Sequence, residues 1–175
     1  SYEQKDEKYN LVAAAVFKNE SHILKEWIDH YIYHGFDHIY LINDESTDNY
    51  KEIINPYIES GKVTLFENKL KINTYPRQKF VYNKYILPIL SNSKWWAILD
   101  LDEFLYCPNE ININNIIKKY ENSNDVSQIY AKWLLYGSDG HIEQPDLVVP
   151  NFLRRKKETE NESVKSIFKG KDLID

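Results

Sequence analysis

The chain has 175 residues and a formal net charge of -5; 42% of its residues are hydrophobic and 28% are charged. This length and composition suit a single folded domain with a core of its own, and the acidic balance argues against nucleic acid as the main partner. With one cysteine there is no internal disulfide framework, and no apolar run approaches the ~18 residues that a membrane span needs.

Strand-like and helix-like patterns alternate along the chain after a polar lead-in at residues 1–9, which we expect to be flexible. Compact apolar runs predict strands at residues 11–17, 38–43, 62–67, 95–100 and 127–135. Apolar residues at helical spacing predict helices over Ile23–Ile32, Ile53–Ile58, 77–91 and Ile113–Tyr120. This order predicts an α/β fold in one domain over residues 1–175, with a mostly parallel sheet and helices on both faces.

The predicted helices carry signals at their ends. Gly35 stands where a C-terminal glycine belongs, and Pro88 is expected to end or kink the third helix. We expect Asn19 or Ser21 to cap the first helix, and a side chain of Ser46-Thr47-Asp48 to cap the second. The chain opens on Ser1 and not on Met, so we also expect that an N-terminal segment has been removed.

Two carboxylates, Asp100 and Asp102, follow the fourth predicted strand at positions i and i+2. In an extended backbone, side chains two residues apart point the same way, so the two carboxylates are expected to converge. A hard divalent cation could then lie between them and the phosphates of a ligand. Ligands of open α/β sheets gather at this carboxyl end of the strands, which makes the motif a candidate metal site.

Polar segments also follow the first and second predicted strands, at Lys18-Asn19-Glu20 and Asp44-Glu45-Ser46-Thr47-Asp48. Taken singly, such segments are more often helix caps or solvated loops. Because the carboxyl ends of neighbouring parallel strands meet, their coincidence with the D-x-D motif favours a shared ligand cleft. In that cleft Asp44 is expected to accept hydrogen bonds from a base or ribose, and Asn19 or Glu20 to do likewise.

The helix before the D-x-D strand offers cationic and amide groups for phosphates. Arg77, Gln78 and Lys79 begin it, and Lys84 follows further along. Guanidinium and ammonium groups bind phosphate oxygens through charge-assisted hydrogen bonds. The alternative interpretation is a solvated, charged helix face.

A set of short motifs runs in order through roughly residues 10–170. It comprises Lys18-Asn19-Glu20, Leu24-x-Glu26-Trp27-x-x-x-Tyr31, Gly35-Phe36-Asp37-His38-Ile39-Tyr40, Asn43-Asp44-Glu45-Ser46-Thr47-Asp48-Asn49, Gln78-x-x-x-Tyr82-Asn83, Trp96-Ala97-x-x-Asp100-x-Asp102-Glu103-Phe104, Trp133-x-x-Tyr136-Gly137-Ser138-x-Gly140-His141 and Lys165-Ser166-Ile167. With this set the chain resembles GT-A-type glycosyltransferases related to family 2, in particular the branch that includes glycosyltransferase family 92.

The resemblance implies a GT-A (Rossmann-like) fold and transfer of a sugar from a nucleotide donor, a UDP-sugar, to a hydroxyl of a glycan or protein acceptor. It implies Mn²⁺ or Mg²⁺ held by Asp100 and Asp102, with Asp100 also near the diphosphate. Asn19, Glu20 and Asp44 are then expected near the nucleoside. Nothing in the sequence points to one particular sugar, acceptor, compartment or oligomeric state.

An inverting transfer, which we expect here, needs a general base that takes the proton of the acceptor hydroxyl. The segment Gly137–His141 is the candidate location, with Asp139 first and Glu143 second. His141 is an alternative base or a metal ligand. The simpler interpretation of this segment is a glycine-containing turn after a strand.

Family members generally continue past the Lys165-Ser166-Ile167 motif, where a further histidine often completes the metal site. This chain ends at Asp175, so we expect a domain shortened at its C-terminus, with a less complete metal site. A non-catalytic module that binds a nucleotide sugar or glycan is therefore an alternative. A haloacid-dehalogenase-like phosphotransferase is less favoured, since its D-x-D commonly lies on the first strand, whereas here it lies on the fourth and is followed by Glu103-Phe104.

Overall fold

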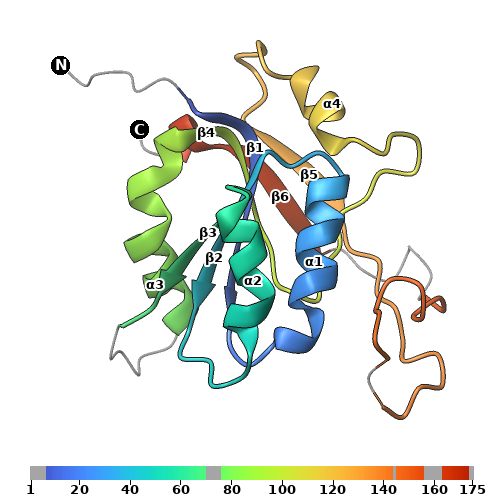
Figure 1. Ribbon diagram of the computed structural model, residues 1–175. Helices are drawn as coiled ribbons and strands as arrows, with labels where there is room; N and C mark the ends of the chain where they lie inside the picture. Colours follow the sequence, from blue (N-terminus) through green and yellow to red (C-terminus); the bar gives the residue numbers. More distant parts are fainter. Residues whose placement is uncertain (1–6, 70–75, 144, 156–162, 174–175) are drawn as a thin grey trace.

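The computed structural model describes residues 7–69, 76–143, 145–155 and 163–173. These residues form one mixed sheet with the strand order β3-β2-β1-β4-β6-β5 (Figure 1). The strands are β1 (Tyr9–Phe17), β2 (His38–Asn43), β3 (Val63–Glu67), β4 (Ser93–Ile98), β5 (Gln128–Lys132) and β6 (Val164–Lys169). The α-helices are α1 (Ser21–Tyr33), α2 (Tyr50–Glu59), α3 (Arg77–Tyr85) and α4 (Ile113–Lys118), and η1 (Leu87–Asn92) and η3 (Gly170–Leu173) are 3₁₀ helices.

The centre of the sheet is parallel and one side is antiparallel. β1 pairs in parallel with β2 and β4, and β2 pairs in parallel with β3. β6 lies antiparallel between β4 and β5. The predicted mostly parallel sheet is confirmed, but β6 was missed: its sequence VKSIFK mixes polar and apolar residues and is only partly buried, so it lacks the continuous apolar run of a central strand.

Helices cover both faces of the sheet, as predicted. Trp27 of α1 and Ile54 of α2 pack in one apolar cluster with alternate residues of β1, and these helices lie in front of the sheet in Figure 1. Val81 of α3 and Leu90 of η1 pack in a second cluster on the other face. Because both faces are covered, the central strands read as continuous apolar runs. None of the described helices is both long enough and apolar enough to cross a membrane.

The ends of the helices were predicted less well than their existence. Gly35 does follow α1 with φ +86°, and α3 ends at Tyr85, before Pro88. The predicted caps were wrong, because neither α1 nor α2 has a capping side chain from its own N-terminal residue. Instead Asp48, from the loop before α2, accepts a hydrogen bond through Oδ2 from the backbone N of Ser21 at 2.8 Å. The cap of α1 is therefore a tertiary contact.

The D-x-D motif lies in a turn and not on an extended strand. β4 ends at Ile98, two residues before the predicted end, and the backbone N of Glu103 donates to the carbonyl of Asp100 at 3.1 Å. Trp27 Nε1 donates to the carbonyls of both residues at 3.1 Å, and the Tyr31 hydroxyl donates to that of Glu103 at 2.8 Å. Buried donors from α1 thus hold the turn, and the argument from strand alternation was wrong for this motif.

Candidate functional site

The carboxyl ends of β1, β2 and β3 lie level at one edge of the sheet, and β4 ends on the same side, slightly before them. Phe17 at the end of β1 pairs with Asn43, which in turn pairs with Glu67 at the end of β3. Ala14 pairs with Ile98, the last residue of β4. The polar segments predicted to share a cleft therefore all leave the sheet at this edge. We call the polar side chains gathered there the edge cluster, namely Glu20, Asp44, Arg77, Gln78, Asp100, Asp102, Glu103 and Lys165.

The loops after β1 and β2 are tied to each other beside the cluster. Asn19 Oδ1 accepts from the backbone N of Thr47 at 2.7 Å, and the backbone N of Asn19 donates to Ser46 Oγ at 2.9 Å. Asn19 and Glu45 both adopt left-handed backbone conformations, with φ 55° and 64°. Such conformations are costly and persist only where surrounding contacts enforce them. Asn19 Oδ1, which was predicted to accept a hydrogen bond from a nucleoside, thus accepts one from the neighbouring loop.

Asp44 forms a two-point ion pair with Arg77. The guanidinium donates from Nε to Oδ2 at 2.8 Å and from Nη2 to Oδ1 at 2.7 Å, and Asn68 donates to Oδ1 at 2.7 Å. The hydrogen bonds from Arg77 hold the pKa of Asp44 below its usual range, against the opposing effect of burial. The side chain of Asp44 is 12% exposed, and its carboxylate is ionised with its orientation fixed.

The side chain of Asp100 accepts hydrogen bonds from two distant parts of the chain. Gln78 Nε2 of α3 donates to Oδ1 at 3.1 Å, and Lys165 Nζ of β6 donates to Oδ2 at 3.1 Å. The same ammonium lies 3.0 Å from Glu103 Oε2, which also accepts from the backbone N of Asp100 at 2.9 Å. The side chain of Asp100 is nevertheless 44% exposed, so one side of it faces solvent.

Glu20 and Asp102 add negative charge to the same place. Burial raises the pKa of Glu20, and the charges of Asp102 and Asp100 raise it further, while its bond from the Lys18 backbone lowers it. Burial likewise raises the pKa of Glu103. Carboxylates gathered at one place repel one another, and a cation among them is stabilised.

The donor set suits a hard divalent cation, because carboxylate oxygens are the ligands that Mg²⁺ and Mn²⁺ prefer. Among the residues that the structure describes, no group of three His, Cys, Asp or Glu side chains is arranged to hold a metal alone. Within that part of the chain, Glu103 Oε1 is also buried without a hydrogen-bond partner. A cation held by Asp100 and Asp102 would therefore need further oxygens from a bound ligand or water.

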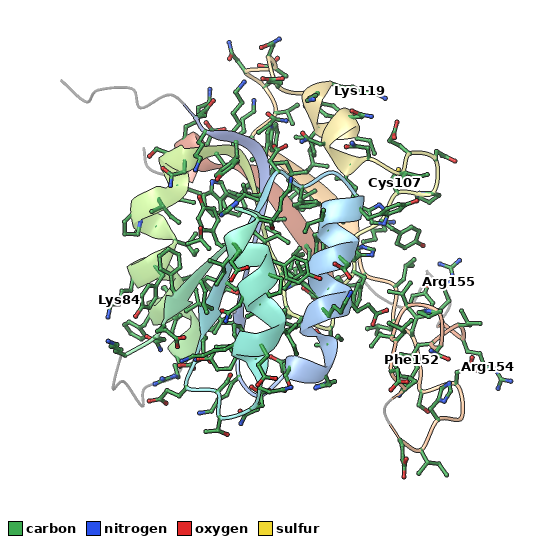
Figure 2. All side chains as sticks on the ribbon, viewed as in Figure 1. Lys84, Cys107, Lys119, Phe152, Arg154 and Arg155 are labelled. Carbon is green, nitrogen blue, oxygen red and sulfur yellow. The ribbon has the colours of Figure 1, made fainter. Side chains whose placement is uncertain are left out.

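Lys84 lies apart from the edge cluster. Figure 2 shows it on the outer side of α3, and its Nζ lies 5.1 Å from the centre of the Tyr85 ring. Of the basic and amide residues predicted to contact phosphate, Arg77 and Gln78 are brought to the cluster. Lys84 is not.

The predicted bases lie on a projecting loop, residues 135–143 and 145–155, which Figure 1 shows outside the layers of sheet and helices. Asp139 Oδ1 lies 2.7 Å from Nε of Arg154, and the ring of His141 packs edge-on against Phe152 at 5.7 Å. Glu143 is exposed. No hydrogen bond or ion pair found among the described residues joins these three side chains to the edge cluster.

Glu26 of α1 fixes the projecting loop to the domain. Its carboxylate accepts from the backbone N of Val148 at 2.6 Å and from that of Val149 at 2.8 Å. The loop is therefore attached beside the helix that also holds the D-x-D turn.

Residues 12–173 match the family model described as glycosyltransferase family 92, which covers most of the chain. The chain belongs to glycosyltransferase family 92. This confirms the family and the glycosyltransferase class predicted from the motifs, and it removes the haloacid-dehalogenase-like alternative.

Curated relatives carry the same family name or, in one case, the name of a galactosyltransferase. The chain is 23% identical over 158 residues to a glycosyltransferase family 92 protein of Ricinus communis, covering 83% of this chain and 26% of the relative. It is 25% identical over 126 residues to the galactan beta-1,4-galactosyltransferase GALS2 of Arabidopsis thaliana, covering 67% and 24% respectively. The chain thus spans about a quarter of the length of these relatives.

A solved structure supports the fold. S. aureus TarS 1-349 superposes with a TM-score of 0.60 at 12% identity, over 94% of this chain and 49% of that one. At this identity the likeness concerns the fold alone. It agrees with the predicted GT-A architecture, a mostly parallel sheet with helices on both faces.

Three residues of this family 92 domain were given no role by the sequence argument. Lys165 stood in a quoted motif, Glu103 followed the D-x-D pair, and Asn68 follows the carboxyl end of β3. Asn68 could have been found by the same rule that singled out the other loops. Lys165 could not, because its position depends on the unpredicted strand β6.

Proposed function

We propose that this family 92 domain transfers a sugar from a nucleotide-sugar donor, a UDP-sugar, to an acceptor hydroxyl, with inversion and with a divalent cation at the D-x-D turn. The observation that carries the proposal is the edge cluster. It combines exposed carboxylates for a cation with amide and cationic groups for a diphosphate, at the edge where α/β sheets bind their ligands.

The donor's nucleoside is proposed to lie against the tied loops after β1 and β2. Asp44 has spare capacity there, because an ionised carboxylate offers about four acceptor positions and three donors already occupy it. Its fixed orientation favours recognition of a base or ribose N–H or O–H. Glu20 lies within electrostatic reach of the D-x-D pair and is proposed to face the same donor.

Asp100 and Asp102 are proposed to hold Mn²⁺ or Mg²⁺. When bound, such a cation offsets the charge that develops on the departing diphosphate. Glu103 orients Asp100 by accepting a hydrogen bond from its backbone N–H, and Gln78 restrains Oδ1 of the Asp100 carboxylate by donating to it. These contacts position the turn before any ligand arrives.

Inverting transfer needs a base on the acceptor side, and we propose Asp139 for it, with Glu143 and His141 as alternatives. Asp139 is the one that the fold already restrains, through Arg154 and a left-handed backbone with φ 51°. Arg154 contacts Oδ1, so Oδ2 of the Asp139 carboxylate is proposed to take the proton of the acceptor hydroxyl.

The test is release of UDP from a panel of UDP-sugars with Mn²⁺ and glycan acceptors. The wild-type chain should turn over one donor, and Asp102→Asn should lose at least about a hundredfold in turnover, the usual scale for one charge-stabilising group. Asp139→Asn should lose turnover while it keeps UDP binding. Asp125→Asn, an exposed carboxylate between α4 and β5, is the matched control and should behave as wild type.

Binding of UDP and Mn²⁺ without turnover of any donor would contradict transfer by this chain. It would favour the alternative of a nucleotide-sugar-binding module. Full turnover in Asp102→Asn would contradict the assignment of the D-x-D turn.

A further inference from the structure

Lys165 occupies the position where a cation is expected, and we propose that its ammonium is a resident counter-ion that competes with a divalent metal for Asp100. The inference rests on the proposed cation site. It adds a residue outside the D-x-D motif that sets how strongly free metal binds there, and so couples metal binding to the arrival of the nucleotide.

The backbone fixes where Lys165 lies. β6 is hydrogen-bonded on both sides, since Ala97 of β4 pairs with Ile167 and Ala131 of β5 pairs with Lys165 itself. In the antiparallel register Lys165 lies two residues beyond the last β4 pair, beside the chain that enters the D-x-D turn. The sheet therefore fixes the backbone position from which the Lys165 side chain reaches the turn.

The ammonium bridges two carboxylates. Nζ is 3.1 Å from Asp100 Oδ2 and 3.0 Å from Glu103 Oε2, and it lies 5.7 Å from the centre of the Trp133 ring. The Lys165 side chain is 25% exposed and Glu103 is 16% exposed, so water screens this pair little. The Asp100 side chain is 44% exposed, so its attraction to the ammonium is partly screened. A dication that approaches Asp100 Oδ2 therefore meets a positive charge already bound there.

Arg77, the other cation in the edge cluster, is not the counter-ion of Asp100. Arg77 directs both hydrogen bonds of its fork to Asp44, and its Nη2 lies 3.5 Å from Glu45. Among the residues that the structure describes, the ion pairs found at the D-x-D turn are those of Lys165. When a diphosphate brings negative charge to this edge, the ammonium gains a new partner and Asp100 is released to the metal.

This predicts two opposite shifts in Lys165→Met. Removal of the competing charge should tighten binding of Mn²⁺ alone by about tenfold. It should weaken binding of UDP in the presence of saturating Mn²⁺, because the diphosphate loses an ammonium partner. If the ion pair were merely structural, Lys165→Met would weaken the binding of both Mn²⁺ and UDP, or leave both unchanged.

The experiment titrates Mn²⁺ by electron paramagnetic resonance, followed by UDP calorimetry at saturating Mn²⁺. Lys165→Arg keeps the charge and should bind Mn²⁺ alone as weakly as wild type. Lys119→Met removes the same charge from the residue that follows α4, at the other end of the sheet in Figure 2, and should match wild type in both assays. Lys165→Gln replaces Lys165→Met if the latter does not fold.

The outcomes separate this inference from the proposed function. If wild type binds UDP with Mn²⁺ but Lys165→Met binds Mn²⁺ alone no more tightly, the counter-ion role is overturned and the donor site stands. If neither protein binds Mn²⁺ with or without UDP, the cation site and the counter-ion role both fail.

Discussion

His30 shows how burial sets the behaviour of a single residue in this fold. Its Nε2 lies 2.7 Å from the carbonyl of Leu105, in the segment after the D-x-D turn. Burial lowers the pKa of His30 to about 4; the contact with Leu105 raises it and His34 lowers it further. The side chain is therefore neutral in the folded protein near neutral pH, whereas in the unfolded chain it takes up a proton below about 6.5.

The free energy of unfolding should consequently fall as the pH drops from about 6.5 towards 4, with His30 contributing a slope of at most about 1.4 kcal/mol per pH unit. His30→Gln keeps a donor for Leu105 and removes the titration, so it should flatten this slope. Urea unfolding at a series of pH values measures it. His38, whose pKa burial also lowers, retains its own share. An unchanged slope in His30→Gln, or an equal change in the exposed control His22→Gln, would refute the assignment.

For single residues, the sequence predicted the position in the fold better than the side chain with which each residue pairs. Asp44 and Asp100 were expected at one edge because each follows a strand of a parallel sheet, and both lie there. The partners, Arg77 on Asp44 and Lys165 on Asp100, are contacts between residues far apart in the chain. No local pattern reveals such a pair, and the predicted roles of these residues toward a ligand stay predictions.

At the scale of elements, the start of α1 depends on a loop from elsewhere in the chain. Asp48 Oδ2 accepts the backbone N–H of Ser21, the first residue of the helix. Asp48→Ala should therefore lower the free energy of unfolding by about 1 kcal/mol, the usual cost of a lost cap. Asp48→Asn keeps an acceptor and should lose less. Urea unfolding near neutral pH measures both variants. An unchanged free energy of unfolding in Asp48→Ala would show that the contact contributes nothing to stability.

The elements predicted best are those buried on both faces. β2 has all six residues buried, and its predicted bounds, 38–43, are the observed ones. β6 is for the most part only partly buried and was missed. The fifth strand, predicted to reach residue 135, ends at Lys132. Burial on both faces of a strand produces a continuous apolar run in the sequence. Antiparallel pairing at one side of the sheet depends on residues that are distant in the chain, and its signal is weak.

At the scale of the whole molecule, the order of elements was enough to predict a mostly parallel α/β sheet, because short right-handed connections leave few ways to arrange it. The edge cluster follows from that topology, since one edge collects the loops after β1, β2 and β4. The predicted bases lie on the projecting loop, whose position depends on contacts such as that of Glu26. Spacing along the chain cannot indicate how far such a loop lies from the sheet.

The central claim is that the edge cluster binds a nucleotide diphosphate together with a divalent cation. Calorimetric titration of UDP, with and without Mn²⁺, into wild type and Asp102→Ala tests it most directly, with Asp125→Asn as the charge-matched control. We expect UDP binding that requires Mn²⁺, is lost in Asp102→Ala and is kept in the control. UDP binding that is indifferent to Mn²⁺ and to Asp102, or no UDP binding under any condition, would contradict the claim.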